Sequence, residues 1–416
     1  MKNPKRYIAL LISAVLLLSV LTSCSAPEKE ITQPAVTTAP SEEETSVTAI
    51  NTVTIGAAGD VLIHRPIYNG ALQDNGEYDF SQVFSAVKDT ISDFDYFIAN
   101  LETTFGGTHG RVYSGYPLFN SPDSLSTALK AAGVDCVLTA NNHTFDSGTE
   151  GALRTISTVK SAGLDYIGTR ENTSQKQYMI KEIGGINFGF ICYTYETIID
   201  EGYKALNGIL VDEEAAGLIN SFRPHDPDEF YTELQDNINK MKAENADVIA
   251  VFIHWGEEYQ IPHNDVQSEI AQKICDMGVD AIIGGHPHVV QPVRTLTSTD
   301  GSHETFCVYS LGNFVSNQRR YLMGIKTGHT EDGIIAKMTF TKFSDGSVTM
   351  DSTEIIPTWV HLYYENNKAV HSIVPLNKDI DENAEALGLT KSSDGITEAK
   401  ASKERTEKVI NYKEEN

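Results

Sequence analysis

Three histidines that directly follow apolar runs are the side chains of this chain best suited to chemistry. His254 follows residues 248–253, and His286 and His288 follow residues 281–283 within the sequence Gly-Gly-His-Pro-His. A neutral imidazole is a common metal ligand. In extended backbone, residues i and i+2 face the same side, so His286 and His288 are expected to point together. The three histidines therefore predict a metal site.

Three oxygen-bearing side chains stand after three other apolar runs: Asp60 after residues 52–58, Glu102 after residues 96–99, and Asn142 after residues 136–140. A carboxylate can bridge two cations, because each oxygen can bind one of them, and an amide oxygen binds a cation without adding charge. Ligands of open α/β sheets bind outside the carboxyl ends of the strands. With the histidines, these residues predict a pair of divalent ions. A ligand set without thiolate suits Mn, Fe or Zn.

A pair of ions of this kind would favour hydrolysis. Two-metal hydrolysis uses a water that loses a proton and attacks in line, while both ions stabilise the developing charge. His143 directly follows Asn142 and could donate a proton to the leaving group. Asp146 could orient His143, or it could cap the helix that follows. The pair Asn141-Asn142 would also suit a tight turn.

The charge of the chain restricts its partners. The formal net charge is −25, and removal of the basic N-terminal residues would make the remainder more acidic still. This charge argues against nucleic acid and against electrostatic binding to anionic lipid. An anionic substrate would therefore have to be attracted by bound metal or by a local arginine.

The N-terminal residues 1–23 resemble a bacterial lipoprotein signal peptide. Lys2, Lys5 and Arg6 precede an apolar stretch over residues 7–20, and Leu-Thr-Ser-Cys24 follows it as a lipobox would. This pattern predicts cleavage before Cys24, lipidation of its thiol, and anchoring at the outer face of the cytoplasmic membrane. The alternatives are an uncleaved anchor or a plain signal with a chance cysteine. Residues 24–51 are rich in Thr, Ser, Pro, Ala and Glu, which predicts a disordered tether.

Residues 52–376 read as one large α/β domain, because strand-like and helix-like runs alternate. The patterns predict helices near residues 81–93, 121–132, 147–162, 229–244 and 266–277, and hairpins over residues 177–193 and 333–356. A mixed sheet, or two packed sheets with helices outside, fits this order best.

Two further features are expected from composition. Residues 377–416 are polar, with few large apolar side chains, which predicts a weak helix or a disordered tail. Four cysteines lie in apolar strand-like runs or in an amphipathic helix, without close spacing: Cys136, Cys192, Cys275 and Cys307. We interpret them as buried thiols, with one disulfide as the alternative.

Six ordered motifs resemble the CapA family of capsule and poly-γ-glutamate synthesis proteins. They are Gly59-Asp-Val-Leu-Ile-His-Arg65, Asn100-Leu-Glu102, Ala140-Asn-Asn-His-Thr-Phe-Asp-Ser-Gly148, His254-Trp-Gly-Glu-Glu-Tyr259, Gly285-His-Pro-His-Val-Val-Gln291 and Tyr309-Ser-Leu-Gly-Asn-Phe314. The resemblance covers about residues 52–315. The family in turn looks like the calcineurin-type metallophosphatases. This implies a four-layer αββα sandwich, with two packed sheets and helices on both outer faces.

The resemblance also implies a role for each motif residue. Asp60 and His288 would hold a first metal ion, Glu102 would bridge two ions, and the second ion would be held by Asn142, His254 and His286. His143 would be the general acid, supported by Asp146. Three residues would contact substrate: Arg65, Asn141 and Glu258. Alternatively, Arg65 could form a surface ion pair without contacting substrate.

One position departs from the metallophosphatase pattern. Those enzymes generally carry Asp-x-His in the first motif, whereas position 62 here is Leu. His64 could compensate or could face solvent. Asn313, in the last motif, could line the site or simply pack. The first metal position is therefore expected to be the weaker one.

Three function classes follow from these patterns. The first is a lipid-anchored, metal-dependent hydrolase that acts on an anionic envelope polymer or its precursor. The second is a non-catalytic accessory protein of a capsule assembly or export machine, in contact with other membrane proteins. The third is a solute-binding lipoprotein, which would leave the histidines and the Asn-Asn-His motif without a purpose.

Overall fold

Two β-sheets form the centre of the fold in this computed structural model, which describes residues 47–197 and 203–412. The first sheet has the strand order β17-β16-β15-β1-β2-β3-β4, and β14 pairs with β1. Its strands are β1 (Ala49–Val61), β2 (Tyr96–Leu101), β3 (Cys136–Leu138), β4 (Asp165–Ile167), β14 (Asn313–Val315), β15 (Asp332–Phe343), β16 (Val348–Glu365) and β17 (Lys368–Pro375).

The second sheet has the strand order β12-β13-β11-β10-β6-β5, and β9 pairs with β6. Its strands are β5 (Tyr178–Ile183), β6 (Ile186–Tyr195), β9 (Ser221–Phe222), β10 (Val248–His254), β11 (Ala281–Gly285), β12 (Val293–Thr297) and β13 (Glu304–Val308). A small separate pair is formed by β7 (Ala205–Leu206) and β8 (Ile209–Leu210).

The two sheets pack face to face over a shared apolar core. Ile55 and Ile98 of the first sheet belong to the same buried cluster as Phe190 and Phe252 of the second. The aromatic rings of Tyr96 and Phe190 stack across this interface, with centroids 5.9 Å apart. Alternation along each strand sends one set of side chains into this layer and the other set outward.

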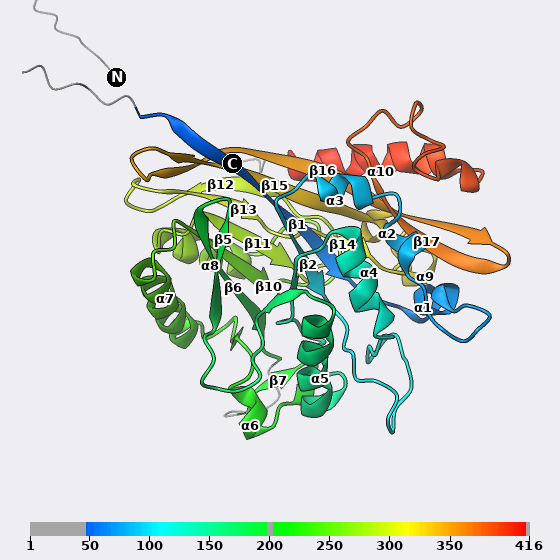
Figure 1. Cartoon of the computed structure of the whole chain (residues 1–416), viewed down its shortest axis with the longest axis horizontal. Helices are drawn as coiled ribbons and strands as arrows, with labels where there is room; N and C mark the ends of the chain where they lie inside the picture. The colour runs from blue at the N-terminus through cyan, green and yellow to red at the C-terminus, as the bar shows by residue number, and fades with distance from the viewer. Residues whose placement is uncertain (1–46, 198–202, 413–416) are drawn as a thin grey trace, which may run out of the picture. The chain divides into compact units, whose positions relative to one another are not determined.

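Helices cover both outer faces. The outer face of the first sheet is covered by α1 (Arg65–Ala71), α2 (Ser81–Phe84), α3 (Lys88–Ser92) and α4 (Ser124–Ala132), and the outer face of the second by α7 (Asp228–Ala243) and α8 (Asp265–Asp276). Three further helices are α5 (Gly148–Ser161), which contacts β4, and the short α6 (Glu213–Ala216) and α9 (Arg320–Met323). Figure 1 shows α7 and α4 on opposite sides of the sheets. The expected four-layer αββα sandwich is confirmed.

Most of the predicted elements are present. The helices predicted near residues 121–132, 147–162, 229–244 and 266–277 correspond to α4, α5, α7 and α8, and both predicted hairpins form, as β5–β6 and β15–β16. The helix predicted over residues 81–93 is divided into α2 and α3. Strand β1 begins at Ala49, so the last three residues of the predicted tether belong to the sheet. Cys24 and most of that tether lie outside the described residues.

Within the described residues, the C-terminal segment contains a packed helix, one of the two forms predicted for residues 377–416. Helix α10 (Gly395–Ile410) comes after the short 3₁₀ turn η2 (Leu389–Lys391). A second 3₁₀ turn, η1 (His329–Glu331), lies before β15. Trp359 on β16 and Val374 on β17 share a buried cluster with Leu389 and Ala399. Asp332 at the start of β15 accepts two hydrogen bonds from Arg405 on α10. Helix α10 thus packs through this apolar cluster and through an ion pair with Asp332.

The four remaining cysteines are free and buried, as expected. Over residues 47–197 and 203–412, no helix has the length and apolar character that crossing a membrane would require. Strands β1, β2 and β3 run parallel, as do β6, β10, β11 and β13. Their carboxyl ends therefore bring the predicted motifs to neighbouring positions.

Candidate metal centre

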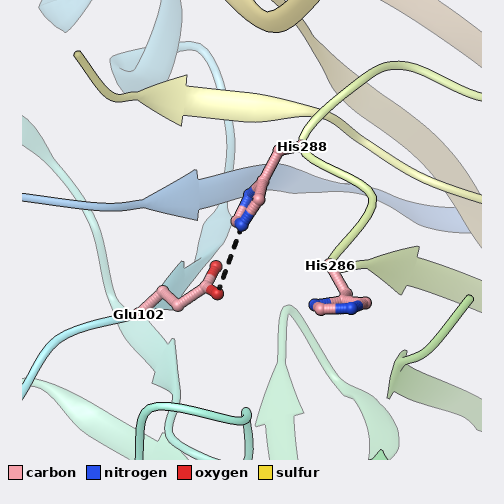
Figure 2. A group of neighbouring side chains, drawn as sticks. All are labelled: Glu102, His286 and His288. Atoms are coloured by element: carbon pink, nitrogen blue, oxygen red, sulfur yellow. Dashed lines mark ion pairs between the residues drawn. The ribbon is translucent and has the colours of Figure 1, made fainter. Parts of the chain in front are cut away.

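The predicted metal ligands come together in a buried cluster at these strand ends. Asp60 lies on β1, Glu102 directly follows β2, and His254 is the last residue of β10. His286 and His288 stand on the loop after β11. Figure 2 shows Glu102 facing His288, with the ring of His286 beside them.

The backbone of the histidine loop differs from the extended form that we expected. His286 has φ of 98° and His288 has φ of 55°, both in the left-handed region. Non-glycine residues rarely adopt this region, and strained backbone of this kind concentrates at functional sites. The two imidazoles are therefore brought to the site by a tight left-handed turn rather than by strand alternation.

The first donor group joins Asp60, His288 and Glu102. The Oδ2 atom of Asp60 lies 3.0 Å from Nδ1 of His288. Oε1 of Glu102 lies 3.8 Å from Nε2 of the same histidine. Both carboxylates are fully buried. Leu62 is buried and apolar, so position 62 supplies no donor to this group.

The second donor group joins Glu102, Asn142, His254 and His286. Nε2 of His254 lies 2.9 Å from Oδ1 of Asn142 and 3.5 Å from Oε1 of Glu102. The rings of His254 and His286 are 4.8 Å apart between centroids. Asn142 thus faces the histidines, as the family resemblance implies for a ligand.

The electrostatics of the cluster suit a bound cation. Burial raises the pKa of Glu102 well above its usual value, and the charges of Asp60 and Glu258 add to this effect. Burial lowers the pKa of His254 to about 3 and that of His286 well below its usual value. The histidines are therefore neutral, with a nitrogen lone pair available, and a cation would compensate the buried carboxylates.

Two buried atoms have the environment of metal ligands. Within the described part of the chain, Oε1 of Glu102 and Nδ1 of His286 have no hydrogen-bond partner. Buried polar atoms without a partner are rare and costly. Two ligand atoms that bind the same ion, each at about 2.1 Å from it, lie roughly 3–3.5 Å from each other. Two spacings in the cluster are close to this range, 3.5 Å from Glu102 to His254 and 2.9 Å from His254 to Asn142, while the 3.8 Å from Glu102 to His288 is longer. Two groups of side chains that share Glu102 could hold metal: Glu102 with His286 and His288, and Glu102 with Asp60 and His254.

His143 and Asp146 form a hydrogen-bonded pair beside this cluster. Nδ1 of His143 lies 2.7 Å from Oδ2 of Asp146, and Nε2 lies 4.0 Å from Oε1 of Glu102. The same Asp146 oxygen accepts a hydrogen bond from the backbone N–H of Phe119, whose ring packs edge-on against His143. Asp146 therefore orients His143, while the residue at the N-cap of α5 is Ser147.

The residues predicted to contact substrate lie in different environments. Asn141 is buried, and its amide donates to Oδ1 of Asn100 and to the carbonyl oxygen of Leu101. The Asn141 amide therefore has partners within the protein, and its contact with a substrate stays a prediction. Arg65, at the start of α1, and Glu258 are both exposed. Glu258 lies near enough for its charge to raise the pKa of Glu102.

His64 and Asn313 lie on the side of the site near Asp60. His64 is half-buried, its ring packs against Phe119, and its Nδ1 lies 3.2 Å from the backbone nitrogen of Asn317. Asn313 is the register partner of Asp60 on β14, and its amide donates to the carbonyl oxygen of His288. Asn313 therefore supports the strained histidine loop.

Sequence reasoning missed one residue of this cluster, Asn100. It is the register partner of Asp60 on β2, and its amide donates to Oδ1 of Asp60 at 2.8 Å. The only sequence signal is its position two residues before Glu102, which places both side chains on the same face of an extended segment.

Comparison with known proteins gives one family and several relatives. Residues 54–318 match the family described as "Bacterial capsule synthesis protein PGA_cap". The chain is 28% identical over 270 residues to the capsule biosynthesis protein CapA of Bacillus anthracis, covering 64% of this chain and 60% of that protein. It is 26% identical over 264 residues to the PGA biosynthesis protein CapA of Bacillus subtilis (strain 168), covering 62% of each. The chain thus matches somewhat less than two thirds of the length of these relatives.

Proposed function

Because this chain belongs to the bacterial capsule synthesis protein family PGA_cap, we propose that it is a metal-dependent hydrolase that acts on a cell-surface polymer or its precursor. Similarity to the two CapA proteins relates the chain to capsule or PGA biosynthesis. One observation carries the catalytic part of the proposal. Oε1 of Glu102 is buried without a hydrogen-bond partner, within 4.0 Å of nitrogen atoms of His143, His254 and His288.

Two divalent ions are proposed to share Glu102. Asp60 and His288 would hold the first ion, and Asn142, His254 and His286 the second. When bound, the ions would supply a nucleophilic water and stabilise negative charge on the substrate. The chain offers Mn, Fe or Zn the imidazole and oxygen donors that each of these ions accepts.

The hydrogen bond between His143 and Asp146 determines where a proton can be transferred. Nδ1 of His143 donates to Asp146, which fixes the orientation of the ring. Nε2 then presents the proton to the leaving group of the substrate. Its position 4.0 Å from Oε1 of Glu102 places it next to the proposed reaction centre. The exposed Arg65 and Glu258 are proposed to contact the polymer outside this centre.

The proposed location is the outer face of the cytoplasmic membrane, with the domain attached through lipid on Cys24. This proposal rests on the lipobox-like sequence and on the Ser- and Thr-rich residues that follow it. An anionic envelope polymer such as poly-γ-glutamate would be the substrate, and membrane proteins of a synthesis complex would be its partners. The acidic net charge of −25 makes the metal ions and Arg65 the means of attracting such a polymer.

A non-catalytic accessory role is the second candidate, and Leu62 is the observation that favours it. Because Leu62 gives no donor, the first ion would have only three protein ligands. A protein with a weak first site could bind polymer without cleaving it.

Turnover with added metal separates the two candidates. The protein would be incubated with Mn²⁺ and either bis(p-nitrophenyl) phosphate or poly-γ-glutamate, and product release would be measured. The hydrolase proposal predicts turnover that falls about 10²–10⁴-fold in His143→Ala. The matched control is His303→Ala, because the His303 ring hydrogen-bonds to the carbonyl oxygen of Val279 and not to a residue of the proposed centre. Polymer binding that survives metal removal, without turnover, would favour the accessory role.

A further inference from the structure

Asn100 occupies a position between the two donor groups. It lies on β2 beside Asp60 on β1, and the two residues are partners in the parallel register. Side chains of neighbouring register partners lie on the same face of a sheet. Asn100 is buried, and its carboxamide is directed toward the carboxylates rather than toward the helical layer.

One carboxamide touches both carboxylate ligands. Nδ2 of Asn100 donates to Oδ1 of Asp60 at 2.8 Å and to Oε2 of Glu102 at 3.4 Å. Each carboxylate therefore has one oxygen held by Asn100 and one oxygen left for other contacts. The remaining oxygens are Oδ2 of Asp60, next to His288, and Oε1 of Glu102, which has no hydrogen-bond partner among the described residues.

Asn141 determines which end of the Asn100 carboxamide faces the carboxylates. Nδ2 of Asn141 donates to the carbonyl oxygen of Leu101 and to Oδ1 of Asn100, and Oδ1 of Asn141 accepts the backbone N–H of His143. The backbone contacts fix the orientation of the Asn141 amide. Asn100 must then turn its oxygen to Asn141 and its nitrogen to Asp60 and Glu102.

We propose that Asn100 is a positioning residue that directs one oxygen of each carboxylate to the metal ions, and that Asn141 acts through it. This inference rests on the proposed metal centre and adds a residue to it. The first ion should depend on Asn100 most, since Leu62 supplies no donor and two of its three ligands, Asp60 and Glu102, are held by this amide. Hydrogen bonds to metal ligands typically change metal affinity about 10–100-fold when they are removed.

The test is a Co²⁺ titration of the full chain, with affinity measured by competition with a chelating dye. Asn100→Leu, which keeps a similar volume, is expected to bind Co²⁺ about 10–100-fold more weakly than wild type. Its visible Co²⁺ spectrum at saturation should also change, because the ligand oxygens are no longer fixed. Asn141→Ala should weaken binding too, and adding it to Asn100→Leu should cause little further loss, because both changes interrupt one chain of contacts.

The matched control is Asn237→Ala, another buried asparagine, whose amide donates to Gln177 and Tyr193 away from the site. It should lower thermal stability and leave Co²⁺ affinity unchanged.

Unchanged affinity and an unchanged spectrum in folded Asn100→Leu would overturn the inference while leaving the metal centre in place. If Asn100→Leu does not fold, Asn141→Ala decides alone, and unchanged affinity there overturns the inference. An equal loss of Co²⁺ affinity in Asn237→Ala would also overturn the inference, because loss of a buried amide far from the site would then have the same effect. Absence of Co²⁺ binding by the wild type would instead overturn the proposed metal centre, and with it this inference.

Discussion

Replacing Glu102 with glutamine is predicted to have opposite effects on the metal-free and metal-loaded protein. Glu102 is fully buried, and burial with the charges of Asp60 and Glu258 raises its pKa well above the usual value. An ionised carboxylate in this position destabilises the folded metal-free protein, because it has lost its hydration. Glutamine has the same shape without the charge. Metal-free Glu102→Gln is therefore expected to be more stable than the metal-free wild type at neutral pH.

This gain in stability should depend on pH in a defined direction. The folded-state pKa of Glu102 is raised above its usual value of 4.5, so the folded protein binds more protons than the unfolded chain between these two pKa values. The contribution of Glu102 is fully present below about pH 4.5 and is lost as the pH rises through the raised pKa. The advantage of Glu102→Gln should therefore grow with pH over that window.

The metal-loaded proteins should show the reverse order. An ion at 100 times its Kd stabilises the folded state by about 2.7 kcal/mol, so two independent ions give about 5 kcal/mol. At roughly 2 °C per kcal/mol for a large domain, the wild type should gain about 10 °C in Tm. Glu102 belongs to both donor groups, so Glu102→Gln should gain almost nothing at the same Mn²⁺ concentration.

Differential scanning calorimetry with and without Mn²⁺, from pH 4.5 to 8, measures both effects on the same samples. A metal-free Glu102→Gln protein that is less stable than wild type at neutral pH would contradict the predicted cost of the buried charge. A variant that keeps the full Mn²⁺-dependent shift in Tm would show that Glu102 is not shared by the ions.

Three further predictions concern single groups. His286→Ala should lose about half of the Mn²⁺-dependent shift in Tm, because only the second donor group contains His286. His143→Ala should keep its bound metal, measured by elemental analysis, while turnover falls. Arg405→Ala should lower the free energy of unfolding by about 3–5 kcal/mol in urea, because it leaves the buried Asp332 carboxylate unpaired. The control Lys408→Ala, which breaks only an exposed pair with Glu404, should change little. A large loss of unfolding free energy in Lys408→Ala would contradict the prediction, because the exposed pair would then contribute as much as the buried one.

The metal donors could be predicted from the sequence because of where they stand. Asp60, Glu102, Asn142 and His254 each follow an apolar run, and parallel strands bring their carboxyl ends to one place. A polar residue directly after such a run could therefore be placed at this edge from the sequence alone. The conformation of the His286–His288 loop carried no such signal, since left-handed backbone at two histidines is set by tertiary contacts such as the hydrogen bond from Asn313.

The parts that could not be predicted depend on partners distant in sequence. Asn100 is an amide in a buried strand, and only its neighbour on β1 shows what it holds. Asn141 was expected to contact substrate, which stays a prediction, and nothing in the sequence indicated that its amide donates to Asn100 and Leu101. Helix α10 has few large apolar residues, and its ion-pair partner Asp332 lies more than 60 residues earlier in the chain.

Metal content is the most direct test of the proposed centre. Protein beginning at Val47, the first residue of the compact unit, would be purified without chelator and analysed for Mn, Fe and Zn beside His286→Ala and the control His303→Ala. We expect about two equivalents of metal in the wild type and in the control, and a lower content in His286→Ala. A wild-type protein that holds no metal, even after each ion is added back, would rule out the proposed metal centre and favour the accessory role.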